Sequence, residues 1–121
     1  MANTTLKEVT ASEFNELLNN KGVVLADFST TWCPPCRAMT PVVERLAERF
    51  AGRAEVVKVD VDREDDLASA HGVRGIPTFL LFANGQVVER VVGATSETAL
   101  AAAIESQLLY ARKDSQPLAV S

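Results

Sequence analysis

The sequence is poor in the residues that build metal sites and disulfide frameworks, since its 121 residues include two cysteines and one histidine. A structural zinc site takes about four Cys or His ligands, more than this chain has. Small secreted scaffolds depend on several disulfides, whereas two cysteines allow one bridge. The chain therefore lacks a complete zinc site of its own and a disulfide scaffold.

An excess of positive charge is also absent, because 12 Lys and Arg against 16 Asp and Glu give a net charge of −4. A sequence-independent nucleic-acid binder needs the opposite balance, so we expect no nucleic-acid partner. No stretch approaches the ~20 apolar residues of a membrane span, and we expect no membrane association. The first residues lack a basic segment followed by an apolar run, so we expect no secretory signal and a cytoplasmic location.

What the chain does have is the composition of one globular domain, with 47% hydrophobic and 23% charged residues. No internal repeat or low-complexity block interrupts it. Helical periodicity ends near residue 109, and the remainder is polar and contains Pro117. We expect a single domain over 1–109 and a disordered tail over 110–121, and we expect a monomer.

Strand and helix patterns alternate along this domain. Short apolar or β-rich runs cover 23–28, 55–61, 78–83 and 86–92. Four segments have helical patterns. The first begins at the capping-box spacing Thr10–Glu13, and the second runs from the cysteines to Phe50. The third covers 62–69, and the fourth begins after Ser96. Asn84-Gly85 predicts a hairpin between the last two strands. This order predicts an α/β fold, a three-layer α/β/α sandwich with a mixed sheet of four to five strands flanked by four helices.

Cys33 and Cys36 lie where the buried run 23–28 gives way to a long amphipathic helix. Unpaired amides and the positive end of the dipole at a helix start favour a thiolate. We therefore expect Cys33 to attack a disulfide, and Cys36, one turn further in, to be more buried and to resolve the mixed disulfide. Pro34 and Pro35 between them are tolerated at a helix start and stiffen the loop.

Two other interpretations of the pair stay open from spacing alone. One is a metal site, including one shared between two chains, and the other is a purely structural disulfide. The first lacks further ligands, and the second would close a loop too short to constrain much unfolded-state entropy.

Several separated segments together make the chain resemble the thioredoxin family over roughly residues 5–109. They are Asp27-Phe28, Trp32-Cys33-x-Pro35-Cys36-Arg37, Pro41, Lys58, Gly72-Val73-Arg74-Gly75-Ile76-Pro77-Thr78, Asn84-Gly85 and Val92-Gly93-Ala94. The resemblance implies that Asp27 is buried beneath the cysteines and assists proton transfer at Cys36. It implies that Lys58 lies near Asp27 and tunes it, and that Pro77 is a cis-proline facing the cysteines. A strand carboxylate satisfied by hydrogen bonds and a plain surface lysine are the alternatives for the first two.

The resemblance also implies a shallow substrate rim around the thiols. Pro77 and the residues beside it would place backbone groups for strand-like pairing with an extended peptide. The expected substrate-binding residues are Trp32, Pro34, Pro35, Val73, Gly75, Ile76, Pro77, Val92 and Gly93. Ordinary packing is the alternative for Trp32, and an ordinary turn is the alternative for Pro77.

Three residues depart from the family pattern. Pro34 stands where the family usually has Gly, in a Cys-Pro-Pro-Cys segment, at a position that bears on the redox potential and the partner preference. Ser29 stands where many members have an aromatic residue. His71 stands where the family often has Tyr, and we expect a solvated helix-end side chain.

The function that follows is a protein disulfide reductase cycling between a Cys33/Cys36 dithiol and disulfide. No bound cofactor and no metal are expected. In the family an external reductase, NADPH-dependent thioredoxin reductase or a ferredoxin-dependent enzyme, supplies the electrons, and disulfide-containing proteins are the substrates. An oxidase or isomerase of the same fold, a docking module without redox activity and a glutaredoxin-like enzyme are the alternatives.

Overall fold

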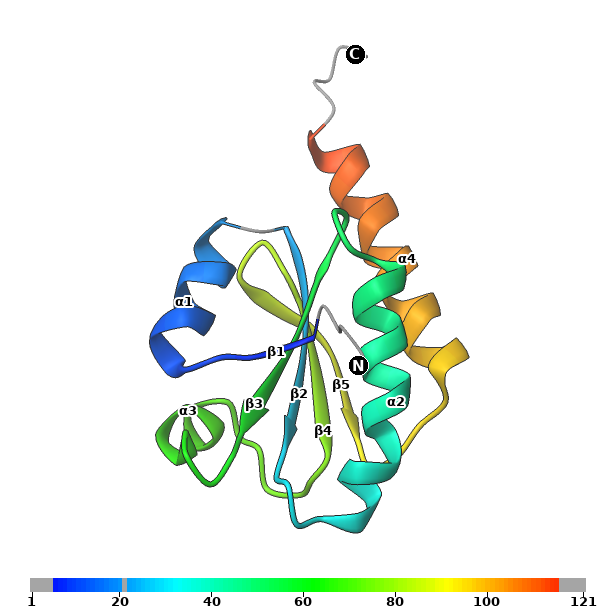
Figure 1. The fold of residues 1–121 in the computed structure, drawn as a ribbon. Coiled ribbons are helices and arrows are strands. Elements are labelled where there is room, and N and C mark those ends of the chain that lie inside the picture. Colours follow the sequence, from blue (N-terminus) through cyan, green and yellow to red (C-terminus); the bar gives the residue numbers. More distant parts are fainter. Residues whose placement is uncertain (1–5, 21, 116–121) are drawn as a thin grey trace.

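The computed structural model describes residues 6–20 and 22–115, with side chains as far as residue 110. Its elements, coloured along the chain in Figure 1, are β1 (Lys7–Glu8), α1 (Ala11–Asn20), β2 (Val23–Ser29), α2 (Pro34–Arg49), β3 (Glu55–Asp60), α3 (Asp65–Ala70), β4 (Thr78–Ala83), β5 (Gln86–Val92) and α4 (Glu97–Ser115).

The five strands form one mixed sheet in the order β1-β3-β2-β4-β5. β3 is parallel to both β1 and β2, whereas β4 is antiparallel to β2 and β5. Helices α1 and α3 cover one face of the sheet, and α2 and α4 cover the other (Figure 1). The predicted three-layer α/β/α sandwich is confirmed.

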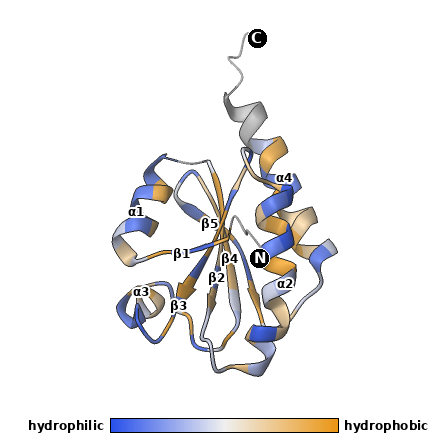
Figure 2. Ribbon diagram, in the orientation of Figure 1, coloured by the Kyte–Doolittle hydropathy of each residue, from blue (hydrophilic) through white to orange (hydrophobic). Residues whose placement is uncertain are grey.

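Strand β2 is the centre of the sheet and is buried on both faces along all seven of its residues. Its side chains alternate, so that Val23 and Leu25 join the apolar cluster beneath α2 and α4. Val24, Ala26 and Phe28 join the cluster beneath α1 and α3. Each helix packs on the sheet with one side only, and Figure 2 shows both hydrophilic and hydrophobic residues on all four.

Local signals at two helix starts act as the sequence predicts. The Thr10 hydroxyl accepts from the Glu13 amide at 3.2 Å, and the Glu13 carboxylate accepts from the Thr10 amide at 2.9 Å. Ser96 caps α4 by accepting from the Ala99 amide at 3.1 Å. Each of these bonds satisfies an amide that the start of a helix leaves without a helical partner.

Two expected boundaries are wrong. The third helix begins at Asp65 instead of residue 62, because Asp60 accepts hydrogen bonds from the amides of Asp62 and Glu64 and holds the intervening segment in turns. The last helix continues to Ser115, past the domain end expected at residue 109. Residues 116–121, where the disordered tail was also expected, lie outside the described residues.

None of the helices in the described part of the chain is long and apolar enough to cross a membrane.

Candidate active site

Cys33 lies at the N-cap of α2, directly after the connection that leaves β2. Its backbone is extended, and Pro34 and Pro35 occupy the first two helical positions, where the absent amide protons have no helical partner to lose. The helix continues through Pro41 to Arg49. The buried strand β2 and the sixteen-residue helix α2 therefore fix the first cysteine from both sides.

The two thiols are free and lie at the first turn of α2. The amide of Cys36 donates to the Cys33 sulfur at 3.3 Å. Cys33 is 4% exposed and Cys36 is 1% exposed, so the second thiol is the more buried. The Cys33 sulfur therefore accepts a backbone N–H donor at the start of the helix, where the helix dipole is positive.

Burial raises the pKa of the Cys36 thiol to about 11. A hydrogen bond to Cys33 and the charges of Cys33 and Asp27 act in the same direction, while the backbone of Thr30 acts against them. Cys36 is thus a protonated thiol at neutral pH, which matches the expectation that the second cysteine is more thiol-like.

Asp27 lies on the same face of β2 as Leu25, beneath α2, and is 1% exposed. Burial raises its pKa to about 6, against the opposing effects of Lys58 and Ser29. Neither carboxyl oxygen has a hydrogen-bond partner of good geometry among the described residues. Lys58 is the register partner of Asp27 on β3, so the two side chains leave the same face of the sheet.

The expected substrate residues come from three connections at one end of the sheet. Trp32, Pro34 and Pro35 follow β2, the segment 73–77 precedes β4, and Val92 ends β5 with Gly93 directly after it (Figure 1). The register pairs Thr78 with both Phe28 and Val92, which brings these connections to neighbouring positions. The sheet therefore assembles the expected rim beside the cysteines.

The segment before β4 is held by its own hydrogen bonds. The Ile76–Pro77 peptide bond is cis, as the family resemblance implies. The Thr78 hydroxyl donates to the Gly75 carbonyl at 2.6 Å, and the Gly93 amide donates to the Pro77 carbonyl at 2.7 Å. Pro77 itself is buried, whereas Val73, Gly75, Ile76 and Gly93 are half-buried.

Trp32 is 63% exposed, as is Val92, so ordinary core packing does not describe either residue. The indole Nε1 of Trp32 donates to Oδ2 of Asp62 at 2.8 Å. Sequence reasoning missed Asp62, which it placed at the start of the helix expected over 62–69. No sequence signal pairs residues from two different connections.

The environment of His71, at this end of the sheet, differs from the one expected. It ends α3 as expected, but its half-buried ring packs against Phe14, Phe28 and Phe82 at centroid distances of 5.9, 6.2 and 5.5 Å. The expectation of a solvated side chain is wrong, because α3 lies against the sheet and the ring of its C-cap residue packs on the phenylalanines of that face. Arg90 on β5, which sequence reasoning also missed, donates to the His71 carbonyl at 2.6 Å.

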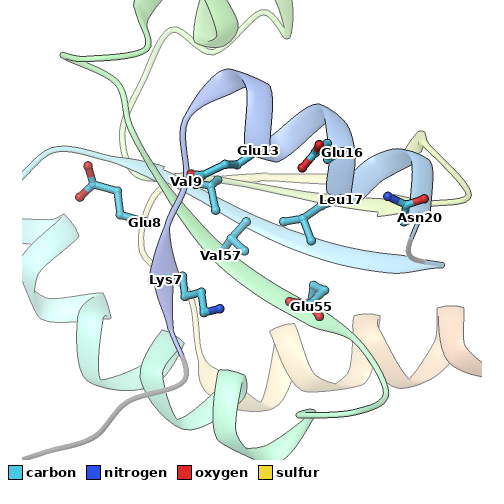
Figure 3. Close-up of a pocket in the computed structure, with 9 residues that line it drawn as sticks. All are labelled: Lys7, Glu8, Val9, Glu13, Glu16, Leu17, Asn20, Glu55 and Val57. Carbon is cyan, nitrogen blue, oxygen red and sulfur yellow. The ribbon is translucent and has the colours of Figure 1, made fainter.

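A hollow of about 350 Å³ lies elsewhere, between β1 and α1 (Figure 3). Its lining is apolar at Val9, Leu17 and Val57 and carries several carboxylates, but it has no thiol or imidazole. Among the described residues, no three His, Cys, Asp or Glu side chains are grouped so as to hold a metal ion.

Two thiols at a strand-to-helix junction, the first accepting a backbone amide and the second held as a thiol near a buried carboxyl group, define the site of a thiol–disulfide oxidoreductase. The sequence matches the family model described as Thioredoxin over residues 5–106. The chain belongs to the thioredoxin family.

Relatives support the same assignment. Thioredoxin 1 of Nostoc sp. is 43% identical over 84% of this chain and 95% of its own length. Thioredoxin of Staphylococcus aureus is 39% identical over 84% of this chain and 96% of its own. The solved structure of a single-residue mutant of thioredoxin from Halobacterium salinarum superimposes with a TM-score of 0.80 and 46% identity, covering 89% of this chain and 96% of that one.

Proposed function

We propose that this thioredoxin is a protein disulfide reductase in which Cys33 is the attacking nucleophile and Cys36 is the resolving thiol. The observation that carries the assignment is the asymmetry of the pair. The Cys33 sulfur accepts the Cys36 amide at the start of α2, while the pKa of the Cys36 thiol is raised to about 11. The thiolate is the nucleophilic form, so the reaction starts at Cys33.

The cycle balances without a bound cofactor. The Cys33 thiolate attacks one sulfur of a substrate disulfide, forms a mixed disulfide and releases the other substrate sulfur as a thiolate. Cys36 loses its proton and attacks the Cys33 sulfur, which forms the Cys33–Cys36 disulfide and releases the second substrate thiolate. The substrate gains two electrons, and the cysteine pair loses them.

Asp27 is the proposed acceptor for the Cys36 proton. With a pKa of about 6, its carboxyl group is mostly ionised at pH 7, and its charge is one of the causes that raise the Cys36 pKa. In the mixed disulfide the Cys33 sulfur carries no negative charge. The charge effect of Cys33 on the Cys36 pKa then disappears, and the proton leaves more easily. Lys58 is proposed to favour the ionised form of Asp27.

The rim formed by Trp32, Pro34, Pro35, Val73, Gly75, Ile76, Pro77, Val92 and Gly93 is proposed to bind the substrate. Exposed apolar side chains at Trp32 and Val92 suit varied protein surfaces. Backbone groups beside Pro77 suit an extended peptide, since main-chain pairing does not depend on substrate sequence.

Thioredoxins act on disulfide substrates and receive their electrons from a separate reductase, with no cofactor of their own. For this chain we propose an NADPH-dependent thioredoxin reductase as that enzyme, a monomeric state and a cytoplasmic location. The Cys-Pro-Pro-Cys segment is proposed to set the redox potential and partner preference through Pro34.

The test is to trap the mixed disulfide. Cys36→Ser, mixed with insulin whose disulfides are intact, is expected to accumulate a mixed-disulfide adduct, because no resolving thiol is present. Dithiothreitol should reduce this adduct. The matched variant Cys33→Ser is expected to form at least about tenfold less adduct, since the remaining thiol is buried and protonated. Adduct formation by Cys33→Ser at the rate of Cys36→Ser would contradict the assignment.

Turnover completes the test. The wild-type protein is expected to reduce insulin when it is coupled to a thioredoxin reductase, with the loss of NADPH absorbance as the measurement. The double variant Cys33→Ser, Cys36→Ser is the matched control and should give no turnover. A folded, fully reduced wild-type sample that does not reduce insulin would contradict the proposed function.

A further inference from the structure

An arginine on the edge strand holds the end of α3. Arg90 pairs with Leu80 in the β4–β5 register, and Leu80 belongs to the apolar cluster on the α1 and α3 side. The Arg90 side chain therefore leaves the sheet on the face that α3 covers. Its Nη2 donates to the His71 carbonyl at 2.6 Å.

The position of that carbonyl makes the contact electrostatically favourable. His71 is the C-cap of α3, whose last carbonyls form the negative end of the helix dipole. Gly72 follows with a φ of 69°, and a Cβ atom there would lie 3.8 Å from Nη2 of Arg90. The guanidinium group thus lies over the turn in which α3 ends.

The His71 side chain fixes the same turn from inside. Its Nδ1 lies 3.2 Å from the Leu67 carbonyl, within hydrogen-bond distance. The ring makes edge contacts with Phe14 and Phe82. One residue is therefore held through its backbone by β5 and through its ring by the core.

The segment that follows is the proposed substrate segment, residues 73–77. Its far end is fixed by the bonds from Thr78 to Gly75 and from Gly93 to Pro77. Its near end is fixed by the Val73 amide, which donates to the Ala68 carbonyl at 2.9 Å, and by the turn held at His71. Movement of that turn would carry the near end of the segment with it.

We propose that Arg90 and His71 together form an anchor that positions residues 73–77 for substrate binding. The anchor rests on the proposed function, because it acts through the surface proposed to bind the substrate. Both are positioning residues, since each acts through the segment and not on the reacting sulfur atoms. Their loss should weaken the capture of protein disulfides and leave the intrinsic reactivity of Cys33 unchanged.

The experiment compares Arg90→Ala, Arg90→Lys and the matched control Arg45→Ala. Arg45 is also a surface arginine, paired with Glu97 at 2.8 Å on the opposite face of the sheet. For each protein we would measure the rate constant for insulin reduction in a single turnover, the rate of Cys33 alkylation by iodoacetamide, and amide hydrogen exchange over residues 72–76.

Arg90→Ala is expected to lower the insulin rate constant about three- to tenfold, the range expected for one lost hydrogen bond, and to speed exchange at residues 72–76. Alkylation should stay within about twofold of wild type, since the anchor does not reach the thiol. Arg90→Lys should recover most of the insulin rate because it keeps a cation at the helix end. Arg45→Ala should match wild type in all three measurements.

The anchor is overturned if Arg90→Ala reduces insulin as wild type does, if it slows alkylation as much as insulin reduction, or if Arg45→Ala has the same effect. Should Arg90→Ala fail to fold, Arg90→Met, which keeps much of the side-chain length but has no donor, replaces it in the same comparison. A wild-type protein whose Cys33 is alkylated normally but which does not reduce insulin would contradict the proposed function. In that case, unchanged amide exchange over residues 72–76 in Arg90→Ala would separately reject the anchor.

Discussion

At the scale of single residues, the active site holds two buried groups whose pKa values are raised for the same physical reason. Burial removes solvation from the charged forms of Asp27 and Cys36, and it is the largest cause of both shifts. A carboxyl group with no well-placed hydrogen-bond partner among the described residues is costly in an apolar layer. The buried Asp27 carboxylate therefore lowers the free energy of unfolding.

Replacing Asp27 should recover that stability. Its pKa rises from 3.8 to about 6 on folding, so the native state binds the proton more tightly than the unfolded chain does. Stability should fall as the pH rises from about 4 to 6, and the loss should be complete above that range. Two pKa units correspond to about 3 kcal/mol, so Asp27→Asn should gain up to about 3 kcal/mol at pH 7 and little at pH 4.

Urea unfolding of the reduced protein between about pH 4 and pH 7 would measure this difference. Asp66→Asn, an exposed carboxylate at the start of α3, is the matched control and should retain the wild-type pH dependence. A wild-type slope that persists unchanged in Asp27→Asn would show that another group causes it.

At the scale of elements, the site depends on contacts between connections that the sheet brings together. Trp32 follows β2 and Asp62 follows β3, and their hydrogen bond joins residues 30 positions apart in the sequence. The Asp62 amide donates to Asp60 at 2.9 Å, and Arg63 reaches from the same turn to Glu8 on β1. The exposed indole of Trp32 is therefore held by the connection that follows β3.

Removing this tether should free the indole without unfolding the protein. Trp32 is the only tryptophan in the sequence, so tryptophan fluorescence reports on this side chain alone. Asp62→Ala should lower the steady-state anisotropy of Trp32 while changing the free energy of unfolding by less than about 1 kcal/mol, as expected for an exposed hydrogen bond. Asp65→Ala, close by at the start of α3, should leave the anisotropy unchanged. Equal anisotropy in wild type and Asp62→Ala would mean that the indole is fixed by packing instead.

At the scale of the whole molecule, the sheet separates two apolar clusters, and the active site lies at one end of both. Helices α2 and α4 pack on one face around Leu46 and Ile104, both fully buried. The anchor of residues 73–77 belongs to the other face. The site therefore depends on cores from both sides of the sheet.

Ile104→Ala should lower the free energy of unfolding by about 2–5 kcal/mol, because it opens a cavity in the α2/α4 core. Leu109→Ala on the same helix removes a side chain that is 62% exposed and should change stability by no more than about 0.5 kcal/mol. Urea unfolding of the two variants compares them directly. Equal effects would contradict the packing role of Ile104.

The sequence by itself determined the order of elements, the layers and the reactive pair. Those features depend on local properties: the nearly continuous apolar run of β2, the spacing of the capping box before α1, the Asn84-Gly85 turn and the two cysteines at a helix start. Each is encoded within a few neighbouring residues, where side-chain period and backbone preference act directly.

Only the tertiary structure decided two contacts at this end of the sheet. The Trp32–Asp62 bond and the Arg90–His71 bond join segments brought together by strand order, and hydrogen bonds require distances that no local pattern specifies. The same reason explains the error at His71. A helix-end histidine is solvated or buried according to which element packs against it, and here three phenylalanine rings from elsewhere in the chain pack around it.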